Sequence, residues 1–145
     1  MHRILGVDYG ERRLGFALSD SLEQIATPFR VERIESAAAA VRVVKKVCED
    51  AGAARIVVGL PVNMNGSRGP QAQRVEQFAV ELAAATGLPV DTWDERLSTR
   101  EAEQVLLSAD TSRRRRREVI DKIAAQLVLQ NYLDARQPPQ EVMEP

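Results

Sequence analysis

Cysteine, histidine and aromatic side chains are scarce in this chain. Its 145 residues include one cysteine, one histidine, one tryptophan, two tyrosines and three phenylalanines. A single cysteine cannot form an internal disulfide, and with the lone His2 it cannot complete a zinc site. So few aromatic rings argue against base stacking as the main means of holding a nucleic acid. Such a ligand would have to be recognised through its backbone and its shape.

Long apolar runs are missing as well. No stretch approaches the roughly 18–20 apolar residues that a membrane-spanning helix needs, and the first apolar run already meets an acid at Asp8, so we expect no signal peptide. Hydrophobic residues make up 44% of the chain and charged residues 28%, which is typical of a folded globular protein. We therefore expect one soluble, cytoplasmic domain over residues 1–136 and a disordered tail over residues 137–145.

The charge is nearly balanced overall but uneven along the chain. The formal net charge is −1, and yet residues 113–117 are five consecutive arginines. A balance near zero argues against bulk neutralisation of a polyanion, while it permits a local basic patch beside acidic groups. Runs of like charge are usually solvated, so the arginine run is either a solvated segment or a segment that binds phosphate.

The hydrophobic pattern predicts an α/β fold. We expect strands over residues 4–8, 14–18, 28–34, 55–60 and 90–93, and helices over residues 36–50, 71–85 and 116–135, with a further helix starting at Ser98. Three antiparallel strands followed by two crossover units predict a mixed five-stranded sheet with helices on both faces.

Acidic residues lie where such a sheet places its ligand crevice, at the carboxyl ends of strands. Asp8 ends the first predicted strand, and Asp94 and Glu95 end the fifth. Asp8 is either a turn cap before Gly10 or a ligand for Mg²⁺, which prefers carboxylate oxygens. Adjacent strand residues face opposite ways, so either only one of Asp94 and Glu95 enters the pocket or both are simply solvated.

Asp121 joins these acids from the last predicted helix. It lies at the margin of an expected apolar stripe made of Ile120, Ile123, Ala124, Leu127 and Val128. A helix-boundary acid is most often a solvated residue near the N-terminus. Three acids on three elements near one end of a sheet match instead the carboxylate cluster that two-metal phosphodiester hydrolysis requires.

Two further features have plain interpretations. Cys48 continues the apolar face of the helix over residues 36–50, so we expect a core residue. The loop over residues 61–69 lacks the lysine and the spacing of a P-loop, so we expect no nucleotide-binding glycine loop there.

Short motifs in a fixed order resemble the bacterial YqgF family. They are Gly6-Val7-Asp8-Tyr9-Gly10, Arg13-Leu14-Gly15, Val58-Gly59-Leu60-Pro61, Asn63-Met64, Asp94-Glu95-Arg96-Leu97-Ser98-Thr99, and Asp121-Lys122-Ile123-Ala124-Ala125 with Leu129-Gln130-Asn131-Tyr132-Leu133. Each motif alone is weak, but the ordered set is specific and spans residues 4–133. The names used for this family are Holliday junction resolvase and pre-16S rRNA nuclease.

The resemblance implies a ribonuclease H-like fold and a cytoplasmic nuclease that uses Mg²⁺ or Mn²⁺ to mature the 5′ end of 16S rRNA. By position, the family's catalytic and metal-binding acids fall on Asp8, Glu95 and Asp121. Many relatives have an acid where this chain has Asn65, so we assign that loop no metal role and expect it to shape the substrate cleft. The residues expected to contact nucleic acid are Arg12, Arg13, Asn63, Arg96, Arg113, Arg114, Arg115, Arg116, Arg117 and Lys122.

Other functions stay open at this point. The residues do not distinguish RNA from branched DNA, and only the resemblance favours RNA. A non-catalytic ribosome-assembly factor could use the same fold, although the complete acid set favours catalysis. An actin-like ATPase, whose phosphate loop resembles Asp8-Tyr9-Gly10, needs two lobes of this size, and 145 residues are too few. We expect a monomer or a weak homodimer, since symmetric cleavage of a junction requires two active sites.

Overall fold

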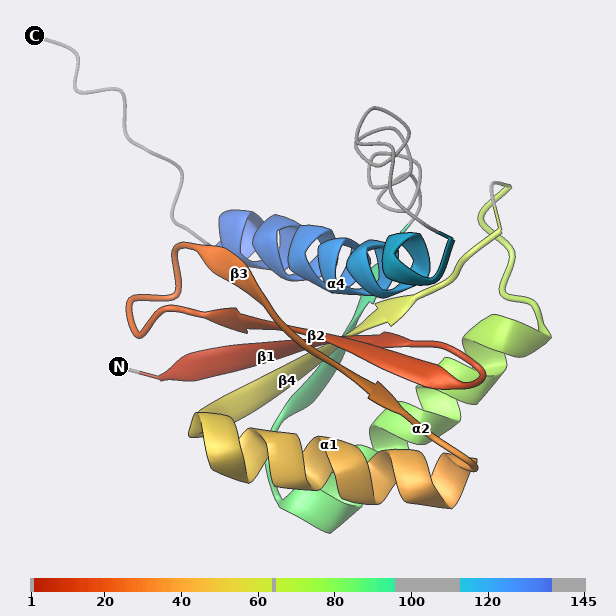
Figure 1. Cartoon of the computed structure of the whole chain (residues 1–145), viewed down its shortest axis with the longest axis horizontal. Helices are drawn as coiled ribbons and strands as arrows, with labels where there is room; N and C mark the ends of the chain where they lie inside the picture. The colour runs from red at the N-terminus through yellow and green to blue at the C-terminus, as the bar shows by residue number, and fades with distance from the viewer. Residues whose placement is uncertain (1, 64, 96–112, 137–145) are drawn as a thin grey trace, which may run out of the picture.

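A five-stranded mixed sheet organises the chain (Figure 1). The computed structural model describes residues 2–63, 65–95 and 113–136. The strands lie in the order β3-β2-β1-β4-β5; β1–β2 and β2–β3 are antiparallel, and β1–β4 and β4–β5 are parallel. The predicted mixed sheet is therefore confirmed. Its strands are β1 (Arg3–Tyr9), β2 (Arg13–Ser19), β3 (Ala26–Arg33), β4 (Ala53–Leu60) and β5 (Val90–Asp94).

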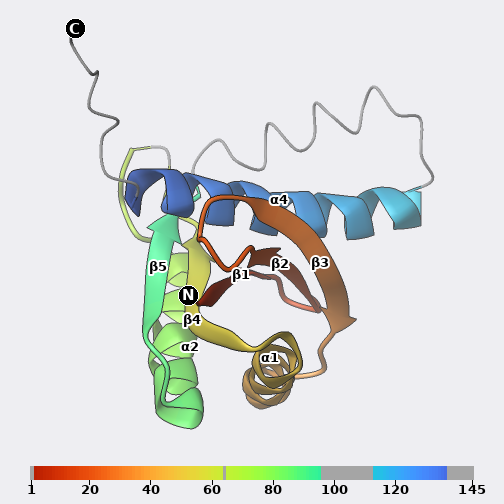
Figure 2. The ribbon, with the colours of Figure 1, turned by 90° about the vertical axis from the view of Figure 1, so that its left-hand side faces the viewer.

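Helices cover both faces of the sheet, as predicted (Figure 2). α1 (Ala37–Ala51) and α2 (Pro70–Thr86) lie on one face, and α4 (Arg113–Arg136) lies along the other. Within the described residues, no helix is long and apolar enough to cross a membrane. The helix predicted to start at Ser98 and the predicted tail over residues 137–145 lie outside the described residues.

Local sequence signals place the ends of several elements. The Ser36 side chain caps α1 by accepting a hydrogen bond from the N–H of Ala39 at 3.1 Å. Gly52 and Gly87 end α1 and α2 with φ of 66° and 70°, a left-handed conformation that glycine adopts without steric cost. These caps explain why the predicted bounds of α1 and α2 are nearly those observed.

The start of α4 differs from the prediction. We expected the helix to begin near Arg116, but its backbone is helical from Arg113 and includes all five arginines. Arginine has one of the better intrinsic helix propensities, so the run extends the helix instead of preceding it as a loop.

The buried stripe of α4 is also rotated from the predicted one. Ile120, Ile123 and Leu127 are only half-buried, whereas Ala124 and Val128 are buried as expected. Asp121 lies one helical turn before Ala125, on the side that faces the sheet, and its side chain is only 15% exposed. It is partly buried and therefore lies at the margin of the buried stripe, as predicted. The buried residues of α4 are Ala124, Ala125, Val128, Leu129, Tyr132 and Leu133.

Three glycines of the sheet leave room for α4 and for the Glu95 side chain. A Cβ atom at Gly6 of β1 would lie 2.8 Å from a side-chain atom of α4, and one at Gly15 of β2 would overlap the backbone carbonyl of Asp121. At Gly59 of β4 it would overlap a carboxylate oxygen of Glu95. Real Cβ atoms essentially never come this close to other atoms, so α4 can take its position only because Gly6 and Gly15 lack side chains. The absence of a side chain at Gly59 leaves room for the Glu95 carboxylate in the same way.

Gly15→Ala is expected to lower the free energy of unfolding by about 1–3 kcal/mol, the usual cost of overpacking. The added methyl group meets helix backbone, which cannot move without shifting α4. Gly59→Ala is expected to cost less, because its methyl group meets the movable end of the Glu95 side chain. Urea unfolding of both variants measures the difference. An unchanged stability in Gly15→Ala would contradict the close approach of α4.

Candidate active site

Strand alternation turns Asp8 toward α4. In β1, Ile4 belongs to the apolar core beneath α4, whereas Val7 belongs to the core on the opposite face. Asp8 is an even number of residues from Ile4 and therefore shares its face. It pairs across the β1–β2 ladder with Gly15, the residue over which the backbone of Asp121 lies.

Glu95 reaches the same place from the end of β5. It follows Trp93, which packs against the core beneath α4, by two residues. Its backbone N–H donates to the carbonyl of Leu60 at 3.1 Å, which extends the β4–β5 pairing past the strand end. Its carboxylate lies against Gly59 and shares a hydrogen bond with Asp8.

Asp94 faces the other side of the sheet. It pairs in register with Leu60, whose side chain belongs to the core beneath α1 and α2. Strand alternation thus separates the two neighbouring acids, with Glu95 beside Asp8 and Asp94 on the opposite face. The expectation that only one of them enters the pocket agrees with this backbone geometry.

Asp121 brings a third carboxylate to the site from α4. It accepts a hydrogen bond from Nε of Arg13 at 2.6 Å, in an ion pair whose side chains are 30% and 15% exposed. Asp8 and Glu95 are thus joined to each other while Asp121 is joined to Arg13. In this arrangement, no three acidic, histidine or cysteine side chains of the described residues are grouped so that they could hold one metal ion.

Burial and the neighbouring acids raise the pKa of Asp8 well above its ordinary value. The largest cause is burial, followed by the negative charges of Glu95 and Asp121, and the charge of Arg13 opposes the rise. Burial also raises the pKa of Glu95, against the effect of its hydrogen bond with Asp8. A cation bound here would relieve this repulsion, and the donor set consists of the hard oxygens that Mg²⁺ and Mn²⁺ prefer. The chemistry of the residues therefore fits such an ion.

Only some of the predicted nucleic-acid contacts gather beside the acids. Arg13 and Lys122 line a hollow of about 390 Å³ next to Asp121, whereas Arg12 lines a second hollow of about 610 Å³. Arg33 lines both hollows, and sequence reasoning missed it. Outside the described part of the chain lie Arg96 and the side chains of Arg113, Arg114, Arg115, Arg116 and Arg117.

Asn63 and Asn65 hold the loop between β4 and α2 in shape. The Asn63 side chain donates to the hydroxyl of Ser67 at 3.0 Å, and the Asn65 side chain accepts from the N–H of Ser67 at 3.0 Å. Both amides are thus used within the loop. A role of Asn63 in contacting nucleic acid stays a prediction.

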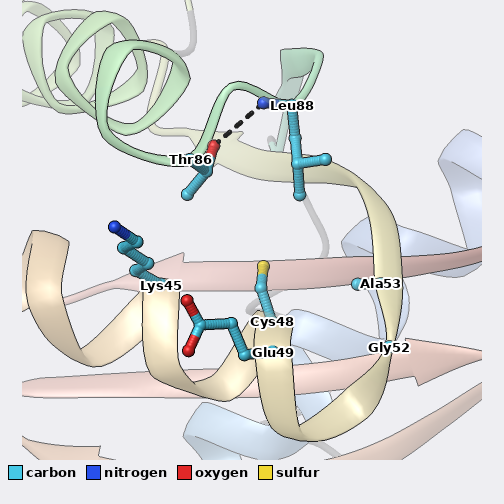
Figure 3. Close-up of a pocket in the computed structure, with 7 residues that line it drawn as sticks. All are labelled: Lys45, Cys48, Glu49, Gly52, Ala53, Thr86 and Leu88. Carbon is cyan, nitrogen blue, oxygen red and sulfur yellow. Dashed lines mark hydrogen bonds between the residues drawn. The ribbon is translucent and has the colours of Figure 1, made fainter.

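A separate hollow of about 330 Å³ lies between the ends of α1 and α2, on the opposite face of the sheet from the acids (Figure 3). Cys48 lines it and is only 4% exposed, so the expectation of a core cysteine is confirmed. Burial, with a smaller effect of the Glu49 charge, raises the pKa of the Cys48 thiol to about 12. The complete lining is Lys45, Cys48, Glu49, Gly52, Ala53, Thr86 and Leu88.

The Cys48 thiol is therefore expected to react slowly with an aromatic disulfide reagent at about pH 8 while the protein is folded, and rapidly once urea unfolds it. Because folding raises this pKa from 9.0 to about 12, the thiol's contribution to stability is complete below about pH 9 and is lost as the pH rises toward 12. Thiol labelling with and without urea checks the first expectation. Unfolding at about pH 8 and about pH 10, with Cys48→Ala as control, checks the second. Rapid labelling of the folded protein would contradict both.

Comparison with known proteins identifies close relatives of the whole chain. A family model described as "RuvX: Holliday junction resolvase" matches residues 2–135. A protein of Symbiobacterium thermophilum named "Putative pre-16S rRNA nuclease" is 51% identical over 134 residues, which cover 92% of this chain and 93% of that protein. A protein of the same name from Pelotomaculum thermopropionicum is 48% identical over 135 residues, which cover 92% and 88%.

Solved structures share the fold at much lower identity. RuvC of T. thermophilus in complex with a Holliday junction substrate has a TM-score of 0.57 at 17% identity, covering 94% of this chain and 96% of that one. The fowlpox virus Holliday junction resolvase has a TM-score of 0.55 at 13% identity, covering 92% and 99%. At such identities the likeness concerns the fold alone, and it confirms the ribonuclease H-like α/β architecture.

The motifs quoted from the sequence lie within residues 2–135, the span that the family model matches, and the two curated relatives each match 92% of the chain. The resemblance of those motifs to the YqgF family is therefore confirmed, since YqgF and RuvX are two names for one family. The chain belongs to this family, which is described as Holliday junction resolvase.

Proposed function

We propose that this chain is a divalent-metal-dependent endonuclease of the cytoplasm that hydrolyses phosphodiester bonds in nucleic acid. The observation that carries the proposal is the convergence of Asp8, Glu95 and Asp121, from two strand ends and a helix, on one side of the sheet. Membership of the RuvX family and the names of the curated relatives agree with nuclease activity.

Asp8, Glu95 and Asp121 would together hold Mg²⁺ or Mn²⁺. Such an ion supplies an activated water and neutralises charge on the scissile phosphate. Asp8 and Glu95 are already adjacent and share a hydrogen bond, while Asp121 is held nearby by Arg13. Release of Asp121 from Arg13 would free a third carboxylate for the ion and a guanidinium for a phosphate oxygen.

We further propose that the substrate is precursor 16S rRNA, because the curated relatives are named as nucleases of pre-16S rRNA. Cleavage at its 5′ end is the part of this proposal that the family resemblance of the sequence motifs implies. A Holliday junction is the second candidate, because the family description names it. Cleavage of one RNA strand needs a single active site, whereas symmetric cleavage of a junction needs two. The RNA proposal is therefore compatible with a monomer or a weak homodimer.

A direct comparison of the two substrates tests the proposal. The purified chain is incubated with Mg²⁺ and either an RNA that joins the precursor segment to the start of 16S rRNA, or a four-way DNA junction. We expect cleavage of the RNA at one position, and its loss on chelation of the metal or in Asp8→Asn. Cleavage of the junction alone would establish the second candidate instead. Binding of RNA without cleavage under any divalent ion would contradict the nuclease proposal and favour an assembly factor.

A further inference from the structure

A hollow next to the acids collects three cationic side chains. Arg13 of β2, Arg33 of β3 and Lys122 of α4 line it together with Val31 and Glu32, around a volume of about 390 Å³. We call this the basic hollow. It lies on the side of the sheet that α4 covers, because Arg13 is an even number of residues from Gly15 and pairs with Asp121.

Among the residues that the structure describes, the charges of the basic hollow are only partly paired. Arg13 and Arg33 are direct partners in the β2–β3 ladder, and like charges at such positions destabilise a strand pair. Arg13 has an ion-pair partner in Asp121, but no described carboxylate, Glu32 included, lies within ion-pair distance of Arg33 or Lys122. The fold thus holds positive charge together at this place at a cost in stability, which a bound anion would offset.

The neighbouring hollow has a different charge balance. Arg12 and Arg33 line it with Glu11 and Glu35, so that two cations face two acids. In the basic hollow, three cations stand against Glu32 and against Asp121, the partner of Arg13, so that positive charge exceeds negative charge by one. The basic hollow is also on the side nearest the acids, because Nε of Arg13 is 2.6 Å from the carboxylate of Asp121.

We propose that the basic hollow binds a non-scissile backbone phosphate of the nucleic acid and so positions the neighbouring scissile phosphate at the acids. The inference rests on the proposed function and adds to it a route for the strand, over the β2–β3 hairpin. Guanidinium and ammonium groups recognise phosphate through charge-assisted hydrogen bonds, which fix the register of a strand without reading its sequence. Arg33 is then a positioning residue, because it is exposed and pairs with none of the three acids.

Arg33→Gln tests the proposal, with Arg42→Gln as the matched control. Arg42 is an exposed arginine of α1, on the opposite face of the sheet, and its variant removes the same charge. Binding of the precursor RNA is measured by fluorescence anisotropy at several salt concentrations, without divalent ions. We expect Arg33→Gln to weaken binding and to reduce the salt slope by about 0.7–0.9, the effect of one lost phosphate contact. Arg33→Lys should restore the slope, and Arg42→Gln should leave it unchanged.

Thermal unfolding separates positioning from a structural role. Because Arg33→Gln relieves a like-charge pair, its Tm should not fall. If the salt slope of Arg33→Gln equals that of Arg42→Gln while the wild-type chain cleaves RNA, the phosphate-binding role of the basic hollow is wrong and the nuclease proposal stands. A wild-type chain that neither binds nor cleaves nucleic acid would overturn both.

Discussion

Asp8→Asn is expected to abolish cleavage and, in the metal-free protein, to raise the Tm. The loss of rate should be about a thousandfold or more, because metal-ion catalysis supplies several kcal/mol and each 1.36 kcal/mol is a factor of ten. The gain in stability follows from the raised pKa of Asp8, whose charge is disfavoured by burial and by the charges of Glu95 and Asp121. An amide has nearly the same volume and no charge. The Tm should rise by about 2–8 °C for each kcal/mol relieved.

Asp20→Asn is the matched control for this variant. Asp20 lies in the β2–β3 turn and accepts hydrogen bonds from the N–H groups of Gln24 and Ile25, which lower its pKa. The same substitution should therefore leave cleavage intact and should not raise the Tm. Single-turnover cleavage and thermal unfolding with and without Mg²⁺ measure both effects, and Mg²⁺ should stabilise the wild type more than Asp8→Asn. If Asp8→Asn cleaves at the wild-type rate, Asp8 is not part of the active site.

Glu95→Gln is expected to lose most of the metal-dependent rate, with little recovery at high Mg²⁺, while Asp94→Asn keeps it. The two residues are adjacent, but the backbone separates them. Glu95 lies against Gly59 and shares a hydrogen bond with Asp8, whereas Asp94 pairs in register with Leu60 on the opposite face. Asp94→Asn should mainly lower the free energy of unfolding, by about 1.5–3 kcal/mol if one charged hydrogen bond is lost.

The pair of variants makes this test internally controlled, since each removes one negative charge from the same strand end. Single-turnover rates at saturating Mg²⁺ and urea unfolding are measured for both. An inactive Asp94→Asn beside an active Glu95→Gln would reverse the assignment of the two acids. Loss of activity in both, with wild-type stability, would mean that strand alternation does not separate their roles.

Much of the fold could be predicted because local signals and chain-connection rules act together. Ser36 and Gly52 bound α1 through caps that the sequence displays directly. The parallel pairing of β1 with β4 follows from the crossover through α1 and not from either strand alone. Because β4 also pairs in parallel with β5, Asp8 and Glu95 lie at the same edge of the sheet, on either side of β4.

The rotation of α4 could not be predicted from its own sequence. Periodicity indicated a stripe through Ile120 and Leu127, but the helix approaches the sheet closely at Gly6 and Gly15. Those glycines lie in other elements more than a hundred residues away, and they determine that the side of α4 carrying Asp121 faces the sheet. Tertiary packing thus overrode the helix's own pattern.

The position of Arg33 depends on strand register. β2 and β3 pair through an irregularity between Phe16 and Ala17, which the sequence does not reveal. A slip of one residue would move Arg33 to the other face of the sheet, away from Arg13. The basic hollow could therefore be found only from the structure.

The position of Mn²⁺ in crystals of this chain, located by its anomalous scattering, tests the metal-dependent site most directly. We expect one strong peak bound by the carboxylates of Asp8 and Glu95, with Asp121 turned from Arg13 toward the ion. The same soak should give no peak there in crystals of Asp8→Asn. A Mn²⁺ peak elsewhere on the molecule, or none at these acids in a protein that still cleaves RNA, would contradict the proposed site.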